Sequence, residues 1–169
     1  RRVLFRSKAL FIFIALWSIV VYYPLAHMVW GEGGLLAEIG SVDFAGGDVV
    51  HISSGVSALV LAIILGRRKG YERVTYRIHN IPFVVLGATI LWFGWFGFNA
   101  GSALGANGLA AHAFMTSAIS SATALLAWML LDVINDKKTT LVGASTGLVL
   151  GLVAITPGAG FEIGRASCR

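Results

Sequence analysis

Long apolar runs alternate with short polar segments along this chain, and the pattern predicts five membrane-spanning helices. Each run is continuous, which excludes spanning β-strands, because lipid-facing and inward-facing residues alternate in those strands. A spanning helix needs about 20 mainly apolar residues. The runs predict helices over residues 9–29, 44–66, 80–101, 109–132 and 140–156. We therefore expect an all-α polytopic membrane protein.

The composition supports this class. The chain is 57% hydrophobic and 12% charged, whereas a soluble domain typically carries about 25% charged residues. Its 21 glycines are spread through the apolar runs, which is typical of closely packed membrane helices. The single cysteine, Cys168, excludes a disulfide within the chain.

The two ends differ from the middle of the chain. Residues 1–7 and 162–169 are short basic segments without hydrophobic periodicity, and we interpret them as adapter-derived or cloning-derived remnants. A genuine basic juxtamembrane tail is the alternative. The remaining domain, residues 8–161, holds 8 basic and 7 acidic residues, so the net charge of +5 does not indicate a nucleic-acid partner. Because both ends are abrupt, we expect a piece of a longer protein.

The distribution of charge predicts the orientation in the membrane. The loops after the first and third predicted helices contain no lysine or arginine, and the first of these loops is acidic. All basic residues of the domain fall on the other side, at Lys8, Arg67, Arg68, Lys69, Arg73, Arg77, Lys137 and Lys138. By the positive-inside rule that side is cytoplasmic. We therefore expect a multi-pass protein of the cell membrane that crosses it five times from the cytoplasm.

His51 is the first candidate for chemistry. If Asp43 caps the second helix, His51 lies about 10–12 Å below the cap, within the hydrocarbon. Ionisable groups at that depth are rare and usually face a cavity or a partner. Small residues share its helix face, at Ser54, Gly55 and Ala58. The alternative is a neutral histidine bonded between helices.

The segment Gly94–Ser102 is the second candidate. Trp95, Phe98 and Ser102 share one side of the third helix near its outer end, where an aromatic ring and a hydroxyl can attract a cation. Spacing alone favours ordinary aromatic packing, and Trp30 at the outer end of the first helix likewise fits an aromatic belt. A separate face carries glycines at seven-residue intervals and predicts a groove for a neighbouring helix. These glycines are Gly87, Gly94 and Gly101.

Motifs of soluble enzymes are missing from the sequence. It contains no P-loop and no metal-binding spacing of cysteine and histidine, so we expect neither a cofactor nor a metal, and a function other than an enzyme's. The glycine-rich segment 143–147 lies within the fifth predicted helix and does not follow a strand. Helix packing explains it better than phosphate binding.

Four motifs point to a family. Residues 27–31 (HMVWG), 43–51 (DFAGGDVVH), 94–102 (GWFGFNAGS) and 143–147 (GASTG, with Thr156-Pro157 after it) closely resemble the ammonium transporter (Amt/MEP/Rh) family, and its bacterial Amt branch in particular. They occur in the family's order and cover nearly all of the domain. The resemblance implies homotrimers of an eleven-helix inverted-repeat fold with one pore per subunit. This chain would correspond to helices four to eight.

The resemblance also implies roles for individual residues. Trp30 and Ser102 would line the external ammonium site, and Phe98 would be one of two stacked gate phenylalanines below it. His51 would be the first of the twin pore histidines and relay the proton. Asp43 would shape the outer site by capping rather than by touching the ion. The second histidine and the partner phenylalanine would lie outside this chain.

The implied function is ammonium transport. Ammonium would be recruited at the aromatic outer site and deprotonated, and ammonia would pass an apolar pore in the bilayer. A PII-type regulator would be a further partner. Two alternatives stay open: an ammonium sensor (transceptor) with the same fold, and a membrane packing subunit without transport.

Overall fold

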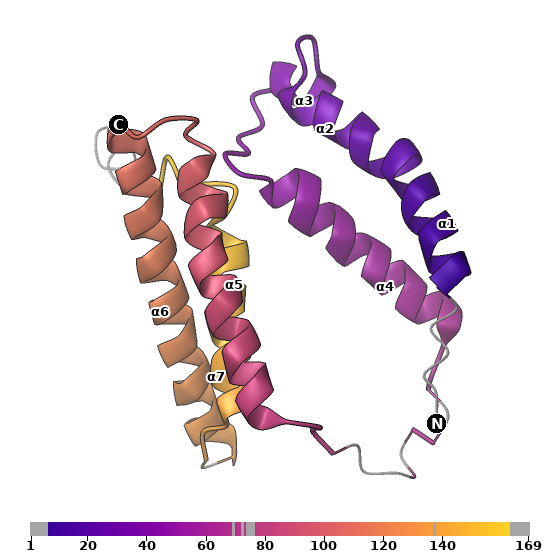
Figure 1. The fold of residues 1–169 in the computed structure, drawn as a ribbon, viewed down its shortest axis with the longest axis vertical. Coiled ribbons are helices and arrows are strands. Elements are labelled where there is room, and N and C mark those ends of the chain that lie inside the picture. Colours follow the sequence, from indigo (N-terminus) through magenta and orange to yellow (C-terminus); the bar gives the residue numbers. More distant parts are fainter. Residues whose placement is uncertain (1–6, 69, 72, 74–76, 137, 163–169) are drawn as a thin grey trace.

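In the computed structural model, the described part of the chain consists of helices joined by loops (Figure 1). The structure describes residues 7–68, 70, 71, 73, 77–136 and 138–162. Most of the two terminal segments interpreted as remnants lies outside these ranges, so that interpretation stays a prediction. Within the described residues no strand occurs, which confirms the all-α class.

The first predicted helix is a rod in three parts. It consists of α1 (Ser7–Trp17), the π-helical turn η1 (Ser18–Tyr22) and α2 (Tyr23–Trp30). Pro24 lies in the first turn of α2. Because proline has no N–H to donate, it interrupts the regular helical hydrogen bonds, and the wider π-helical turn lies directly before α2. A short helix, α3 (Leu35–Glu38), follows in the acidic loop.

The second rod begins later than the sequence predicts. Phe44 to Gly46 form bends, and the helix starts with the π-helical segment η2 (Gly47–Ile52), which continues as α4 (Ser53–Leu65). Gly46 has φ +105°, a left-handed conformation that side-chain-bearing residues rarely adopt. The predicted start at residue 44 is therefore wrong by three residues, because the turn at Gly46 is not helical.

The last three helices agree better with the prediction. They are α5 (Ile81–Gly101), α6 (Gly108–Asp136) and α7 (Leu141–Ile155). The side chain of Asn80 caps α5 through the N–H of Phe83, and that of Thr140 caps α7 through the N–H of Gly143. Helix α6 extends beyond the predicted residue 132, since a helix need not end where its apolar run ends.

Helix α7 packs on α6 through a row of glycines. A Cβ built on Gly147 would lie 2.7 Å from the Trp128 Cβ, and one on Gly151 would meet the backbone oxygen of Ser120. A Cβ on Gly143 would likewise collide with the side chains of Trp128 and Asp132. The prediction that segment 143–147 serves helix packing is confirmed.

The glycine face of α5 behaves differently. A Cβ on Gly87, Gly94 or Gly101 would meet no atom within 4 Å. Among the described residues, none therefore fills the groove that these glycines were predicted to offer a neighbouring helix.

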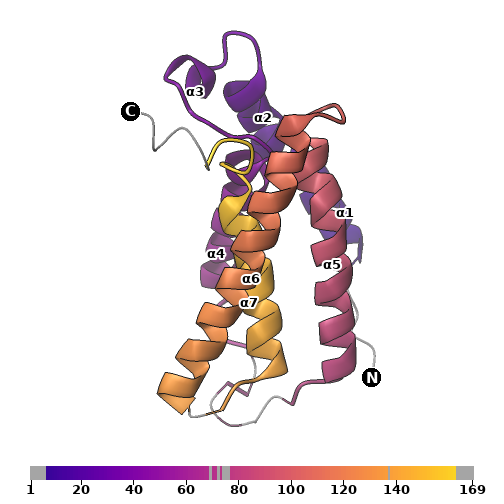
Figure 2. The same ribbon diagram turned by 90° about the vertical axis from the view of Figure 1, so that its left-hand side faces the viewer.

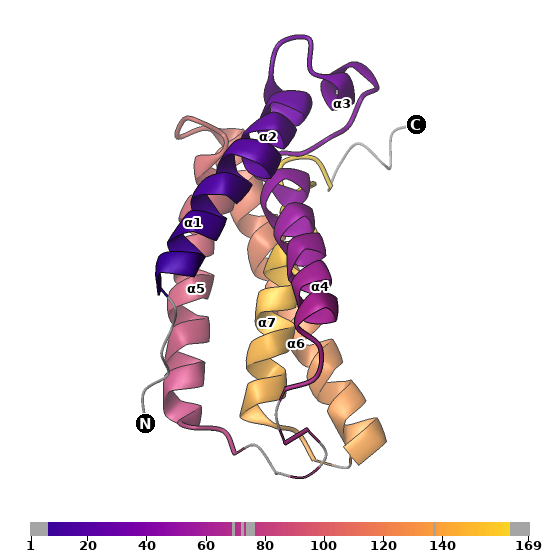
Figure 3. The same ribbon diagram turned by 90° about the vertical axis from the view of Figure 1, so that its right-hand side faces the viewer.

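The helices form two groups that meet at one end (Figures 1 and 3). One group holds α1, α2 and α4, and the other holds α5, α6 and α7. Contact between η2 and α7 joins them, and the groups diverge toward the other end in Figure 1. Figure 2 shows α5, α6 and α7 running side by side.

The helix ends separate the charges as predicted. The starts of α1, α5 and α7 and the ends of α4 and α6 lie toward one end of the molecule (Figure 1). The described basic residues of the domain adjoin these helix ends in the sequence: Lys8, Arg67, Arg68, Arg73, Arg77 and Lys138. Within the described ranges, four helical segments are long and apolar enough to cross a membrane, and α7, with 15 residues, is a shorter apolar helix. Many large apolar side chains are exposed, such as Phe93 at 77%, which suits contact with lipid or with further helices.

Candidate functional site

Asp43 organises the junction between the two helical groups. Its carboxylate accepts four backbone hydrogen bonds: Oδ1 from Gly46 and Gly47, both at 2.7 Å, and Oδ2 from Asp48 at 2.7 Å and Val49 at 3.1 Å. Asp43 is buried. These N–H groups open the helix that carries His51, so the expected cap is present, although the helix starts at Gly47.

The same residue holds Trp30 at the end of α2. The Trp30 indole Nε1–H donates to the backbone oxygen of Asp43 at 2.8 Å, and the far edge of the ring lies over Gly46, where an added Cβ would come within 3.6 Å. Trp30 is 49% exposed, so part of its π face stays open. Nothing in the sequence pattern signalled this bond.

His51 lies in an aromatic stack with α5. Its ring is stacked on Trp95, with centroids 5.2 Å apart and planes 28° apart, and on Phe98, at 5.9 Å and 25°. Trp95 and Phe98 also contact each other at 5.5 Å. The structure therefore brings together His51 and Phe98, two of the predicted site residues. Trp95, which the sequence left undecided between packing and function, contacts both of them.

Thr156, just beyond α7, is the residue that sequence reasoning missed. Its Oγ1 lies 3.3 Å from the His51 Nε2 and accepts a hydrogen bond from the Trp95 Nε1–H at 3.0 Å. Thr156 is fully buried. It belongs to the Thr156-Pro157 motif, so the sequence marked it as part of a pattern but gave no reason to place it beside a histidine 105 positions away.

Ser102 lies at the end of α5, one turn beyond Phe98. Its hydroxyl donates to the Phe98 backbone oxygen at 2.9 Å, which leaves the serine oxygen free to accept. We find no hydrogen bond between Ser102 and Trp30 among the described residues. The two halves of the predicted outer site thus lie on different helical groups without a direct bond between them.

Asn99 fixes the turn of α5 that carries Phe98 and Ser102. Its Nδ2 donates to the Ser117 Oγ of α6 at 2.9 Å, and both side chains are fully buried. Two turns earlier, the Trp92 Nε1 donates to Ser121 at 3.0 Å. Inside an apolar medium such bonds orient one helix against the next.

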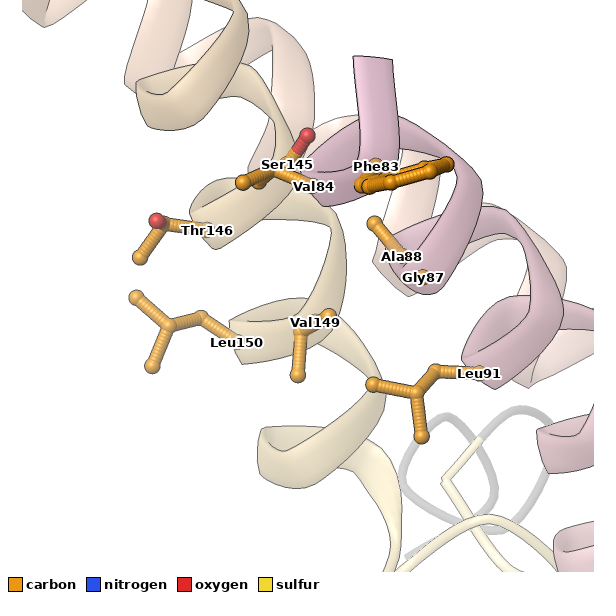
Figure 4. A pocket seen from close by; sticks show the side chains of 9 residues that line it. All are labelled: Phe83, Val84, Gly87, Ala88, Leu91, Ser145, Thr146, Val149 and Leu150. Atoms are coloured by element: carbon orange, nitrogen blue, oxygen red, sulfur yellow. The ribbon is translucent and has the colours of Figure 1, made fainter. Parts of the chain in front are cut away.

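An apolar groove lies between α5 and α7 (Figure 4). Leu91 lies one turn before Trp95, and Val149 lies two turns before Thr156, so the faces that carry the stack also line the groove. Its volume is about 450 Å³. The residues that line it are Phe83, Val84, Gly87, Ala88, Leu91, Ser145, Thr146, Val149 and Leu150.

The described residues contain no cluster of histidine, cysteine or carboxylate side chains that could hold a metal ion. The carboxylate of Asp43, the hydroxyl of Thr156 and the indole of Trp95 are instead bonded to one another or to the backbone. The arrangement is an aromatic lining with a single imidazole, and such a lining can bind a small cation or pass a small neutral molecule.

Residues 4–163 match the sequence profile of the Ammonium Transporter Family. The chain belongs to this family. It is 57% identical over 156 residues to an ammonium transporter of Aquifex aeolicus, covering 92% of this chain and 36% of that protein. It is 50% identical over 162 residues to an ammonium transporter of Bacillus subtilis, covering 96% and 39%. The chain therefore spans little more than a third of these relatives of the ammonium transporter family.

Solved structures agree with this assignment. Mep2 of Saccharomyces cerevisiae superposes with a TM-score of 0.82 at 43% identity, over 89% of this chain and 35% of that one. A protein described as a sensor Amt protein superposes with a TM-score of 0.80 at 32% identity, over 86% and 39%. The predicted family and the polytopic helical fold are confirmed.

Proposed function

We propose that the complete protein transports ammonium across the cell membrane. The observation that carries the proposal is the stack of His51 with Trp95 and Phe98, hydrogen-bonded at Thr156, directly below the Asp43–Trp30 entrance. An imidazole one turn into a helix that is long enough to span the membrane, with aromatic rings beside it, suits a small cation that has to lose a proton. The named relatives, which are ammonium transporters, support the same substrate.

The outer site uses Trp30 and Ser102. The open π face of Trp30 attracts ammonium, and the serine oxygen accepts one of its N–H groups. Asp43 does not bind the ion directly, because four backbone N–H groups occupy its carboxylate. Its backbone oxygen orients the Trp30 indole. The carboxylate therefore adds negative potential at the entrance without touching the ion.

Below this site, Phe98 acts as a gate and His51 as the proton relay. An intact ammonium ion would lose its hydration shell on entering an apolar pore, which is costly, whereas neutral ammonia passes more easily. A neutral imidazole can hydrogen-bond ammonia and can take up a proton. Phe98 is 39% exposed and contacts the His51 ring, so it lies where it can separate the outer site from the imidazole.

Beyond the stack, ammonia follows the groove between α5 and α7 (Figure 4). The only hydroxyls that line it, on Ser145 and Thr146, donate back to the carbonyls of Leu141 and Val142. The groove thus presents mainly apolar surface, and a neutral molecule can pass it without binding tightly.

The setting of the pore is also part of the proposal. The basic loops face the cytoplasm, as the positive-inside rule implies. The complete protein forms homotrimers and binds a PII-type regulator at its cytoplasmic face, as the family resemblance implies. The large exposed apolar surface of the described helices suits burial against the rest of the subunit, its neighbours and lipid.

A sensor of the same fold is the second candidate. The superposition on a sensor Amt protein speaks for it, but the identity of 32% is lower than the 50% and 57% to the named transporters. A packing subunit without transport would not require the His51 stack.

The test uses the full-length protein reconstituted in proteoliposomes. We expect His51→Ala to lower the ammonium-evoked, charge-coupled current at least tenfold. His79→Ala is the matched control, because His79 is exposed at the start of α5, and it should leave the current unchanged. A full current with His51→Ala would refute the proton relay. If the wild-type proteoliposomes neither conducted a current nor took up ammonium, transport would be refuted and the sensor favoured.

A further inference from the structure

The hydroxyl of Thr156 is surrounded by three polar partners. Its Oγ1 lies 2.7 Å from the backbone oxygen of Leu152, 3.0 Å from the Trp95 Nε1 and 3.3 Å from the His51 Nε2. We infer that Thr156 fixes the tautomer of His51: in the neutral imidazole, the proton is on Nε2 and the free lone pair is on Nδ1. Thr156 is thus a positioning residue for the imidazole.

Counting donors and acceptors leads to this assignment. A threonine hydroxyl has one proton to donate and two lone pairs that accept. The Leu152 carbonyl can only accept, so the threonine hydroxyl donates its hydrogen bond to this oxygen. The Trp95 indole can only donate, so its N–H occupies one of the two lone pairs of the threonine oxygen. The single site left on the oxygen is a lone pair, and the His51 Nε2 can meet it only as an N–H donor.

The distances favour this arrangement over its reverse. The bond to Leu152, at 2.7 Å, has the usual length of a strong O–H···O bond. If the hydroxyl turned to donate to Nε2 instead, it would exchange that contact for the longer one of 3.3 Å. Leu152 and Thr156 are both fully buried, so water cannot readily replace a lost partner.

The surroundings hold both side chains in place. The Trp95 ring is stacked on one part of the imidazole at 5.2 Å and Phe98 on another at 5.9 Å, which limits rotation of the ring. In addition, the Pro157 backbone oxygen accepts from the Phe44 N–H at 2.8 Å, and this bond ties the segment after α7 to the segment before the His51 helix. The threonine cannot move away without breaking this junction.

A consequence follows for the direction of proton transfer. The inference rests on the proposed function only in this step: if His51 relays a proton, Nδ1 is the atom that accepts it. We find no hydrogen bond to Nδ1 among the described residues. Any group that contacts Nδ1 in the complete protein must donate to a neutral His51, and protonation of Nδ1 leaves the bond to Thr156 intact.

The test is ¹⁵N solid-state NMR of the full-length protein in liposomes, with labelled histidine and with His51→Ala to identify the resonances. The chemical shifts of the two imidazole nitrogens distinguish the tautomers. We expect a protonated Nε2 and an unprotonated Nδ1 in the wild type and in Thr156→Ser. In Thr156→Val, which has a similar shape but no hydroxyl, the ratio of the two tautomers should move at least about fivefold toward protonated Nδ1.

The possible outcomes separate the inference from the proposed function. A wild-type spectrum with protonated Nδ1 overturns the inference, and so does a Thr156→Val spectrum identical to the wild type. The wild-type spectrum suffices for a decision if the valine variant does not fold. The NMR measurement requires no transport, so a protein with the expected tautomer but without ammonium uptake would refute only the transport proposal.

Discussion

Replacing Asp43 with asparagine removes half of a buried network of hydrogen bonds while changing little in size. The asparagine keeps one oxygen for the N–H groups of Gly46 and Gly47. Its NH₂ group replaces Oδ2 and faces the N–H groups of Asp48 and Val49, which lose their acceptor. A buried donor without a partner costs about 1–3 kcal/mol. We therefore expect the complete protein to lose about 3 kcal/mol in free energy of unfolding.

Asp48→Asn is the matched control. It makes the same change of charge five residues later, where the side chain is half-buried and accepts only from the Ser41 hydroxyl at 3.2 Å. Its cost should stay below about 1 kcal/mol. Both free energies can be measured by denaturant titration of the purified full-length protein in mixed micelles, with tryptophan fluorescence as the readout.

Ammonium affinity provides the second readout. Because the Asp43 backbone oxygen holds Trp30, loosening of the cap should raise the KM for ammonium together with the loss of stability. If Asp43→Asn lost ammonium binding but unfolded at the same denaturant concentration as Asp48→Asn, the reasoning would be refuted. Asp43 would then act on the ion directly.

Two further predictions concern the packing and the orientation. Gly147→Val should lower the unfolding midpoint of the full-length protein strongly, because its Cβ would collide with α6; an unchanged midpoint would contradict the helix packing. In an otherwise cysteine-free background, Leu104→Cys should react with a membrane-impermeant thiol reagent added outside whole cells, and Lys138→Cys should not. The reverse labelling pattern would contradict the proposed orientation.

The sequence predicts the helices well because apolar runs and capping residues are local features. The starts of α5 and α7 follow from the capping residues Asn80 and Thr140, each of which lies one residue before its helix. The start of the second rod does not follow, because a left-handed Gly46 cannot be told from a helical glycine by composition. The extension of α6 past residue 132 also cannot be predicted from the apolar residues alone, because the added residues lie beyond the apolar run.

The site is less predictable because its parts come from three helices. Spacing placed Trp95, Phe98 and Ser102 on one side of α5, and the structure confirms that Trp95 and Phe98 are in contact. Spacing could not show that His51 stacks on them, or that Thr156 joins the stack. Such contacts depend on how helices cross. The roles of Trp30, Ser102, Phe98 and His51 in transport stay predictions.

The junction of Pro157 with the second rod also constrains how sequences of this family can diverge. A Cβ on Gly47 would lie 2.5 Å from the Pro157 ring, so a larger residue at one position requires a smaller one at the other. The two positions lie more than a hundred residues apart, yet they should vary as a pair across related genes. A larger residue at Gly47 alone should displace the imidazole of His51, which lies one helical turn after Gly47.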